Sequence, residues 1–351
     1  MPDPRKDIDI LETALDDNEN SSRQLRRQKI DLRASKELHK RLAIIDEEII
    51  RVFKSERGEP EILYDTAQHL LQAGGKHVRS LLTTLSCEAV GGSFNEALPF
   101  AVATEFVQTA SLIHDDVIDD DAIRRGVEST HRKFGSRMAI IAGDLLIARA
   151  MKLVSDHASL ELMNIVAAAG IQMCEGEASD ILMYLITSNQ FTTKSYFDVV
   201  RRKTVSFMRA AAKVGAMIGK ASEEQSSILE IFGEQMGYAF QIKDDILDVV
   251  ASENSVGKSV LSDLKGNKTN YVLVHALESS SEEEAKHSIE LLKNGEIDFA
   301  LDLIKRSDSI EHADSLAYEY AAKAKETIRN KGFLNEDLLC ALADHACDRD
   351  F

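Results

Sequence analysis

Residues 111–126 read SLIHDDVIDDDAIRRG, and Asp115, Asp116 and Asp119 form a D-D-x-x-D motif inside an apolar helical pattern. The motif returns in residues 240–249, which read FQIKDDILDV. Carboxylates one turn apart on a mostly buried helix repel one another and resist the loss of water. A strong cation between the two motifs would remove both costs. The sequence therefore predicts a divalent-metal site that binds a polyanion.

Helical spacing divides the three aspartates of the first motif between two helix faces. Asp115 and Asp119 are four residues apart and share one helix face, whereas Asp116 points away from that face. Gln108 and Ser111 precede Asp115 by seven and four residues, which places them on the same face. The face shared by these four residues is the predicted inner face.

The second motif has a matching face made by Gln241, Asp244 and Asp248, and Asp245 is offset from it. Oxygen ligands without a nearby Cys or His set suit Mg²⁺. One such motif is more often a solvated helix face, but two, each preceded by a glutamine, favour a metal site. The predicted metal ligands are Asp115, Asp116, Asp119, Asp244 and Asp248.

Composition limits the class of protein. The chain has 351 residues, 44% of them hydrophobic, and a formal charge of −17. That charge argues against nucleic acid as a main partner and against a broad basic membrane face. The four cysteines show no C-x-x-C pairing, which is typical of an intracellular protein with reduced thiols. We expect an intracellular location, in the mitochondrion or the cytoplasm.

The distribution of proline predicts an all-α fold. The prolines are Pro2, Pro4, Pro60 and Pro99, and none follows. Long helices exclude proline, whereas strand-and-turn proteins rarely avoid it. Apolar residues in 139–156 and 227–250 recur at spacings of three and four. Everything after about residue 38 is therefore predicted to be helical, as a large bundle.

Two capping boxes and several polar stretches indicate where helices begin and end. Ser222 with Gln225, and Ser281 with Glu284, are each predicted to open a helix. Residues 187–195, 252–267 and 278–282 are predicted loops. Residues 1–37 differ in charge pattern and are predicted to be a charged, possibly flexible extension, with a helix that packs on a partner subunit as the alternative. Residues 38–351 form one domain.

Cations surround the acidic motifs in the sequence. Gly74 and Gly75 interrupt the chain, and Lys76 and Arg79 are then expected three residues apart on the next helix. The other candidates are Arg124, Arg125, Lys203, Lys258 and Lys268. Arginine suits bidentate phosphate contacts and lysine acts as a point charge. Each alone is more often a surface charge, but together with two acidic motifs they predict a phosphate site.

These segments together resemble the trans-isoprenyl diphosphate synthases, also called polyprenyl diphosphate synthases. The resemblance runs from about residue 40 to the end. It is carried, in the family's order, by GGKHVRS (74–80), LIHDDVIDDDAIRRG (112–126), HRKFGSRMAIIAGDLLIARA (131–150), RRKTVSF (201–207), FQIKDDILD (240–248) and GKSVLSDLKGNKT (257–269).

The resemblance implies a fold and a reaction. The fold is all-α, a large single-domain helical bundle of the isoprenoid synthase type with a central active-site cavity. The reaction is the condensation of isopentenyl diphosphate with an allylic diphosphate. Three Mg²⁺ ions are expected, with Mn²⁺ able to substitute, held by Asp115, Asp119 and Asp244 with Asp248 in support.

The resemblance also implies roles for the remaining residues. Arg124, Lys203 and Lys258 would contact the allylic diphosphate, with Lys268 nearby. Lys76, Arg79, Arg125 and Gln108 would form the isopentenyl diphosphate pocket. Thr204 and Gln241 would face the allylic cation.

The chain departs from the family pattern at several positions. His77 stands where arginine is frequent, Ser80 where proline is frequent, and Leu261 where a small residue is usual. Val127 and Glu128 replace a common basic-Pro pair. None of these removes a metal ligand, so an active enzyme is expected.

Residues just before the first motif bear on product length. Bulky aromatic residues at the fifth and fourth positions before Asp115 would stop a growing chain, but these positions are Ala110 and Ser111. A farnesyl-length product is therefore disfavoured, although small residues also permit close helix packing. We expect a long-chain product that serves as a quinone side-chain precursor, as in ubiquinone biosynthesis. Geranylgeranyl diphosphate is the alternative.

Two further alternatives remain. A class I terpene cyclase shares the fold and the first metal motif but needs no second diphosphate pocket. A subunit of a heteromeric synthase is the other, although such a subunit should have lost acidic ligands. The resemblance implies a homodimer, with a heteromer as the alternative, and at most peripheral membrane contact for product release.

Overall fold

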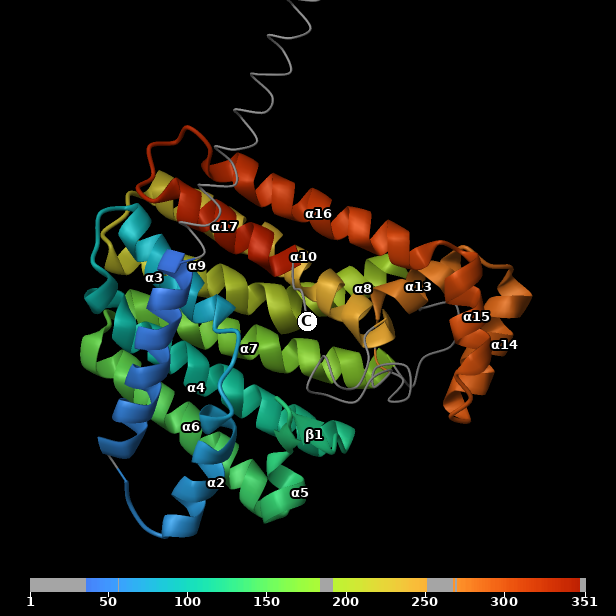
Figure 1. Cartoon of the computed structure of the whole chain (residues 1–351), viewed down its shortest axis with the longest axis horizontal. Coiled ribbons are helices and arrows are strands. Elements are labelled where there is room, and N and C mark those ends of the chain that lie inside the picture. The colour runs from blue at the N-terminus through green and yellow to red at the C-terminus, as the bar shows by residue number, and fades with distance from the viewer. Residues whose placement is uncertain (1–35, 56, 184–191, 251–267, 269, 348–351) are drawn as a thin grey trace, which may run out of the picture.

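A computed structural model describes residues 36–55, 57–183, 192–250, 268 and 270–347 (Figure 1). The predicted extension, apart from residues 36 and 37, lies outside the described residues, as do the loop over 252–267, Lys258 and Leu261. Within the described ranges no helix is long and apolar enough to cross a membrane.

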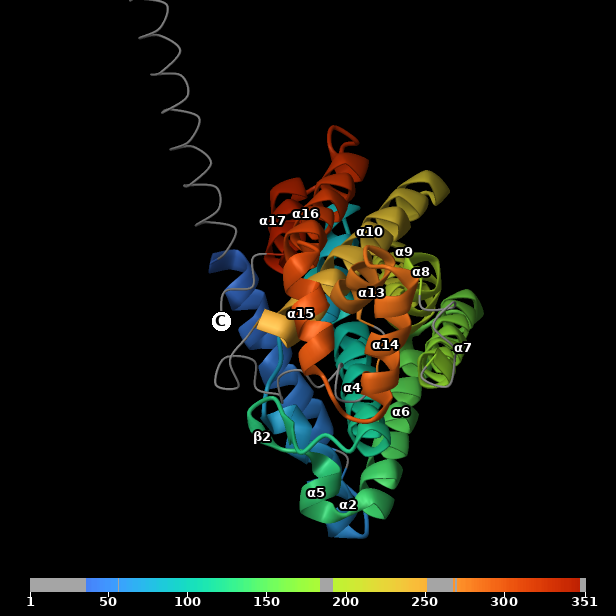
Figure 2. The same ribbon diagram turned by 90° about the vertical axis from the view of Figure 1, so that its right-hand side faces the viewer.

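The described chain is an α-helical bundle, which confirms the predicted fold class (Figures 1 and 2). A first helix covers residues 36–55. It is followed by α2 (Glu61–Gln72), α3 (Val78–Ala89), α4 (Phe94–Asp119), β1 (Ile123–Arg124), β2 (Val127–Glu128), α5 (Thr130–Phe134), α6 (Ser136–His157), α7 (Leu160–Met183), α8 (Thr193–Val200), the π-helix η2 (Arg201–Val205), α9 (Ser206–Ile218), α10 (Glu223–Val250), α13 (Tyr271–Glu278), α14 (Glu282–Lys293), α15 (Asp298–Arg306), α16 (Ser309–Ile328) and α17 (Glu336–Cys347).

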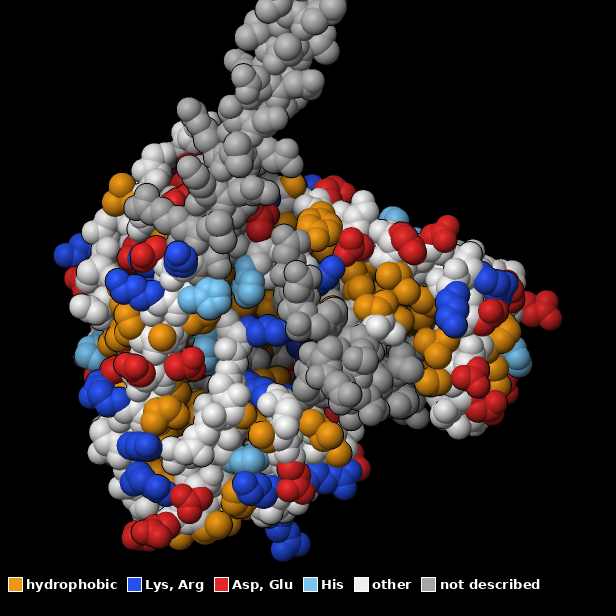
Figure 3. Space-filling model, in the orientation of Figure 1, with side chains coloured by type: hydrophobic (Ala, Val, Ile, Leu, Met, Phe, Trp, Pro, Cys, Tyr) orange, Lys and Arg blue, Asp and Glu red, His pale blue; other side chains and the backbone are white. Residues whose placement is uncertain are grey.

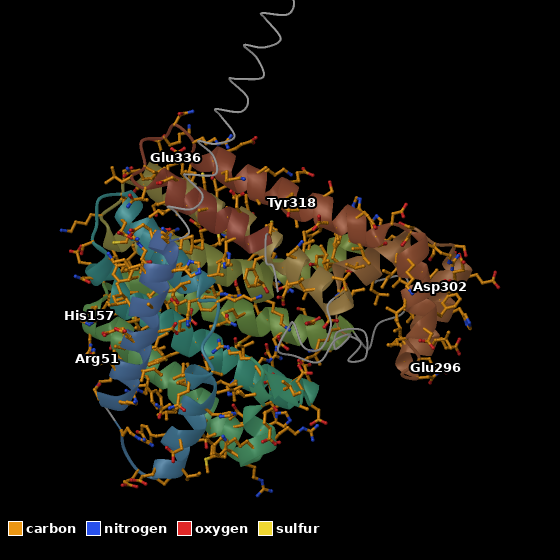
Figure 4. The ribbon with its side chains drawn as sticks, in the orientation of Figure 1. Arg51, His157, Glu296, Asp302, Tyr318 and Glu336 are labelled. Carbon is orange, nitrogen blue, oxygen red and sulfur yellow. The ribbon has the colours of Figure 1, made fainter. Side chains whose placement is uncertain are left out.

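Two apolar cores hold the bundle together. The larger includes Leu82, Phe106 and Phe232, which brings α3, α4 and α10 around a common interior. The smaller lies where α13, α15 and α16 pack on α8 and the end of α10, and it includes Tyr196 and Tyr271. Figure 4 shows Tyr318 on α16, and Glu296 and Asp302 at the end of the molecule formed by α14 and α15. The second motif in α10 thus borders the smaller core.

Helix starts follow local chemistry closely. Both predicted capping boxes are present, since Ser222 and Gln225 exchange hydrogen bonds, as do Ser281 and Glu284. A third, Ser93 with Glu96, opens α4 and was not predicted. Pro99 lies inside α4, where it removes one backbone donor.

Three details differ from the sequence prediction. Residues 193–195, predicted to lie in a loop, form the start of α8. Lys76 is not on a helix: α3 begins at Val78, because His77 adopts a left-handed backbone conformation with φ 45° and ends the turn. The chain after the first motif is a small antiparallel hairpin in which Arg124 pairs with Val127. Positive φ angles at Arg125 and Gly126 turn this hairpin, a geometry that helical periodicity does not reveal.

Candidate active site

The first motif closes α4 and presents two of its three aspartates together. Asp115 and Asp119 lie one turn apart near the C-terminal end of the helix, as predicted. The Nζ atom of Lys268 lies 2.6 Å from Asp119 Oδ2. Burial raises the pKa of Asp115, the nearby Lys203 lowers it, and the negative charge of Asp119 raises it further. The inner face is therefore acidic, partly desolvated and bordered by lysine.

Asp116 has a different setting. Its side chain is fully buried, and Arg124 Nε donates a hydrogen bond of 2.7 Å to its Oδ1. Arg124 also lies 2.9 Å from Asp121, so one guanidinium joins the motif to the hairpin. Burial raises the pKa of Asp116 to about 6, against the effect of Arg124. Binding of a metal by Asp116 stays a prediction; the structure shows that its Oδ1 accepts a hydrogen bond from Arg124 and so helps to hold that side chain in place.

Lys203 is held over the first motif by carboxylates from α7. Its Nζ lies 2.6 Å from Glu177 and 2.8 Å from Asp180. Burial would lower the pKa of Lys203, but Asp180, Asp115 and Glu177 together raise it well above its ordinary value. Burial raises the pKa of Glu177 to about 7, against the charge of Lys203. Lys203 is therefore a cation held by Glu177 and Asp180 whose charge also acts on Asp115.

The position of Lys203 depends on an unusual backbone. Residues 201–205 form a π-helix between α8 and α9, and single π turns are frequent at functional sites. Gly176 of α7 lets this backbone approach, because a Cβ there would lie 2.3 Å from the Lys203 nitrogen. On the other side, a Cβ at Gly237 would lie 3.1 Å from Val205 Cα. The π-helix is thus packed between α7 and α10 at glycines.

The second motif is joined to the π-helix by a chain of hydrogen bonds. Thr204 Oγ1 donates to Gln241 Oε1 at 2.7 Å, and Gln241 Nε2 donates to Asp245 Oδ1 at 2.9 Å. The other oxygen of Asp245 accepts a 2.7 Å bond from the backbone nitrogen of Tyr271. Asp245 therefore fixes both Gln241 and the first turn of α13, as its offset position allows.

The remaining aspartates of the second motif differ in exposure. Asp244 is partly exposed on α10, whereas Asp248 is fully buried one turn later. Of the predicted ligands here, Asp244 is thus the more accessible to a bound ion.

The donor set fits a hard divalent cation. Asp115 and Asp119 on α4 and Asp244 on α10 offer only carboxylate oxygens, which Mg²⁺ prefers together with water and substrate phosphates. Among the described residues, no group of three or more His, Cys, Asp or Glu side chains is placed so that it could hold a metal ion. The raised pKa of Asp115, caused first by burial, is what a cation at the inner face would reverse.

A second group of cations gathers at the turn before α3. Arg125 Nη1 donates a 2.9 Å bond to the Leu70 carbonyl oxygen, and a Cβ at Gly75 would lie 3.1 Å from Arg125 Nη2. The guanidinium of Arg79 lies 5.3 Å from the ring centroids of both Phe207 and Phe240. Figure 3 shows Lys and Arg side chains near the middle of the face it displays. The structure thus brings Arg125 from the hairpin to the turn that carries Lys76.

The residues before the first motif occupy two environments. Ala110 is fully buried in the larger core. Gln108 and Ser111 are partly exposed, and the Ser111 hydroxyl donates a 2.9 Å bond to the Gln108 carbonyl oxygen. A role for Ala110 and Ser111 in product length stays a prediction.

Sequence reasoning did not find several residues of this region. Glu177 and Asp180 are three residues apart on α7, a spacing that places both on one helix face beside Gly176, and this was the available signal. The other set surrounds His77, whose ring lies between Asp46 and Glu105. These two carboxylates come from the first helix and α4, so no local motif joins them.

Comparison with known proteins gives one family. The family model described as polyprenyl synthetase matches residues 60–302. A short chain isoprenyl diphosphate synthase of Methanothermobacter thermautotrophicus is 37% identical over 83% of this chain and 91% of its own length. The geranylgeranyl pyrophosphate synthetase of Pyrococcus horikoshii superposes with a TM-score of 0.79 at 32% identity, over 93% of this chain and 100% of its own.

A second solved structure carries ligands. The polyprenyl synthase of Caulobacter crescentus, complexed with calcium and isoprenyl diphosphate, superposes with a TM-score of 0.79 at 30% identity, over 88% of this chain and 97% of its own. Family model, relatives and fold agree on one family. The chain belongs to the polyprenyl synthetase family and is a trans-prenyltransferase of the isoprenoid synthase fold.

Proposed function

We propose that this protein condenses isopentenyl diphosphate with an allylic diphosphate in a Mg²⁺-dependent reaction to give a trans-polyprenyl diphosphate. The observation that carries the proposal is the alternation of charge around the first motif. The charge of Lys203 acts on Asp115, and Lys268 lies 2.6 Å from Asp119. Alternating cations and carboxylates suit a diphosphate bound together with divalent ions.

The residues divide into two binding sites. Asp115, Asp119 and Asp244 would hold three Mg²⁺ ions, with Asp248 behind them, and Mn²⁺ could substitute. When bound, Mg²⁺ stabilises the negative charge that develops on a diphosphate leaving group. Arg124, Lys203, Lys258 and Lys268 would add fixed positive charge to the same allylic diphosphate. Lys76, Arg79, Arg125 and Gln108 would bind the second diphosphate.

The chemistry needs no protein nucleophile. The allylic C–O bond breaks, and the electron pair leaves with the diphosphate. The double bond of isopentenyl diphosphate attacks the allylic cation, and the released pyrophosphate takes the final proton. Thr204 and Gln241, which are joined by a 2.7 Å hydrogen bond, would present oxygens to the cation. Excluding water from the site protects the cation during this step.

The test is release of pyrophosphate by purified protein with both substrates and Mg²⁺. We expect activity that EDTA abolishes and that Mg²⁺ or Mn²⁺ restores. Product formed from the allylic diphosphate alone would instead establish a class I terpene cyclase. Activity that appears only after a second subunit is added would establish a heteromeric synthase. No turnover under any of these conditions would refute the proposal.

Product length has two candidates. Small residues at Ala110 and Ser111 favour a long-chain product, of the kind that supplies quinone side chains such as that of ubiquinone. Geranylgeranyl diphosphate is the second candidate, because the relatives reported above include a short chain isoprenyl diphosphate synthase and a geranylgeranyl pyrophosphate synthetase. Mass analysis of products from farnesyl and geranylgeranyl primers distinguishes them.

A double substitution tests the length assignment directly. Ala110→Phe with Ser111→Phe is expected to shorten the product while leaving pyrophosphate release measurable. Ala110 is buried in the core, so Ser111→Phe alone is the milder comparison. An unchanged length distribution in both variants would remove these positions from the assignment.

We further propose that the chain works as a homodimer. Ile140, Ile147 and Met151 are exposed and lie along one face of α6, and Ile171 is exposed on the neighbouring α7. An exposed apolar stripe of this kind is typical of a protein contact. Ile147→Asp is expected to shift the mass measured by light scattering from two chains to one. Binding to a different subunit, or at most peripheral contact with a membrane, are the other outcomes.

The proposed location is intracellular, in the mitochondrion or the cytoplasm. The four cysteines are all free thiols, which persist in reducing compartments. Fractionation of cells with an antibody to the protein would test this. Recovery from the secreted fraction would refute it.

A further inference from the structure

His77 is enclosed by carboxylates at the turn that carries Lys76. Its Nε2 lies 2.7 Å from Asp46 Oδ1, on the first helix, and its Nδ1 lies 2.8 Å from Glu105 Oε2, on α4. The imidazole is almost fully buried, as is Glu105, whereas Asp46 is half exposed. Carboxylates from two helices that are distant in sequence thus lie against the one imidazole ring of His77.

The geometry indicates the charge of the ring. A neutral imidazole has one N–H and one lone pair, so one of two facing carboxylates would meet a lone pair. The doubly protonated imidazolium has an N–H on each side, so that it donates to Asp46 through Nε2 and places Nδ1–H 2.8 Å from Glu105 as an ion pair. Burial alone would lower the pKa of His77, but Glu105 and Asp46 raise it above its ordinary value. Burial alone would raise the pKa of Glu105, but His77 and Ser80 lower it. The site therefore holds one cation between two anions.

Other charges act on the same group. The charge of Arg125, from the hairpin, interacts with both Glu105 and Asp46 and so competes with His77 for them. On the turn itself Lys76 precedes His77, and Arg79 follows on α3. The Ser80 hydroxyl donates to Glu105, which fixes this carboxylate toward the ring. His77 and Arg125 are thus the two cations that the buried Glu105 faces.

The backbone of the turn at residues 74–77 needs contacts that restrain it. His77 has φ 45°, a left-handed conformation that costs a non-glycine residue free energy, and Gly74 has φ 73°. Neither angle is held by a regular helix, since α3 begins only at Val78. The carboxylate contacts of His77 hold the backbone between Lys76 and Arg79 in this conformation. Losing them would release both cations from their fixed spacing.

We propose that His77 is a positioning residue whose imidazolium, held between Asp46 and Glu105, fixes Lys76 and Arg79 for the second diphosphate and makes its binding depend on pH. This inference rests on the proposed function, because it assumes that these two cations bind isopentenyl diphosphate. A group with a raised pKa stays charged below its ordinary pKa, and its contribution is lost as pH rises through the folded value. Affinity for isopentenyl diphosphate should therefore fall on the alkaline side.

The experiment measures KM for each substrate and kcat from about pH 6 to about pH 9, on the full chain with Mg²⁺. His77→Gln keeps the size of the side chain but removes the charge. At the acidic end, its KM for isopentenyl diphosphate should be about tenfold above that of the wild type, the effect of one charge-assisted hydrogen bond. The KM for the allylic diphosphate and kcat should stay within about twofold. At alkaline pH the two proteins should converge.

Two further variants separate positioning from folding. Asp46→Asn removes only the half-exposed partner, so the protein should fold normally and the alkaline fall in affinity should move to lower pH. His287→Gln, an exposed histidine on α14, is the matched control and should behave as wild type. If His77→Gln fails to fold, the proposal is tested by Asp46→Asn alone, through the shift in the pH at which its affinity for isopentenyl diphosphate falls.

Several outcomes would overturn the inference. They are an unchanged KM for isopentenyl diphosphate in His77→Gln, an equal rise in both KM values, or a pH profile in Asp46→Asn that matches wild type. Failure of the proposed function looks different, because the wild-type protein would then release no pyrophosphate from the two substrates at any pH.

Discussion

The two D-D-x-x-D motifs have the same sequence pattern but different surroundings. In α4 the motif lies at the end of a helix, so that Asp119 is followed by a turn and a hairpin. In α10 it lies before two further helical residues, and Asp248 is fully buried. The second aspartate of each motif nevertheless has the same structural role. Asp116 and Asp245 are both buried, and each forms a hydrogen bond that holds a neighbouring element.

This comparison separates the predicted ligand positions of the motif from its structural position. Asp115 and Asp244 are partly exposed. Asp116 holds the hairpin through Arg124, and Asp245 holds the start of α13 through the Tyr271 nitrogen. Substitutions at the two kinds of position should therefore fail in different ways, by loss of turnover or by loss of stability.

The largest effect is expected at the first ligand position. Asp115→Ala should lower kcat/KM by about a thousandfold or more, because charge stabilisation of the leaving group is lost. The thermal midpoint should not fall, since removing this carboxylate relieves the repulsion between Asp115 and Asp119. Pyrophosphate release and circular dichroism measure the two quantities. Asp156→Ala, at an exposed position on α6, is the control; loss of folding in Asp115→Ala would break the distinction.

The next effect is on stability, at Asp116. Asp116→Ala leaves the Arg124 cation, which is largely buried, without its closest partner. Removing one partner of a buried ion pair typically costs about 3 kcal/mol of the free energy of unfolding. Urea denaturation measures this. A cost below about 1 kcal/mol would mean that Asp121 alone can hold Arg124, and that Asp116 is not the anchor.

A matched pair in the second motif gives a smaller effect. Asp245→Asn places an amide donor where Gln241 or the Tyr271 nitrogen already donates, which should cost about 2 kcal/mol of stability. Asp244→Asn should leave stability unchanged but lower turnover, because its carboxylate is predicted to bind metal. Measuring both properties in both variants sharpens the comparison. Equal behaviour of the two variants would contradict it.

The smallest effect concerns α13, which Asp245 anchors. The rings of His275 and His312 stack with centroids 4.1 Å apart. Burial lowers the pKa of His275, and His312 lowers it further. Protonation is therefore disfavoured in the folded state, so stability should fall as pH drops below about 6.5 and through the folded value. His275→Gln should flatten this acidic slope in thermal melts; an unchanged slope would assign it to other groups.

Sequence reasoning predicted what depends on local periodicity and motif. It gave the helical bundle, the capping boxes at Ser222 and Ser281, and the shared face of Asp115 and Asp119. For Asp116 and Asp245, sequence reasoning predicted only that they lie off the shared face of each motif. Helical spacing does not show which other elements pack against these residues. Their partners, Arg124 and Tyr271, depend on where a hairpin and a later helix pack.

Other features depend on tertiary contacts and have no sequence pattern of their own. The π-helix at residues 201–205 is not distinguishable from an α-helix by apolar spacing. Lys76 was expected on a helix, but a left-handed His77 delays the start of α3. His77 lies in the turn before α3, and Glu105 lies on α4. No short sequence motif predicts the contact between them.

The packing of the π-helix limits how this site can be varied. At position 176 even a methyl group would occupy the space of the Lys203 backbone nitrogen, 2.3 Å away. Backbone cannot rotate aside as a side chain can, so alanine there is a large perturbation rather than a small one. A mutational library aimed at new substrates should therefore hold Gly176 constant.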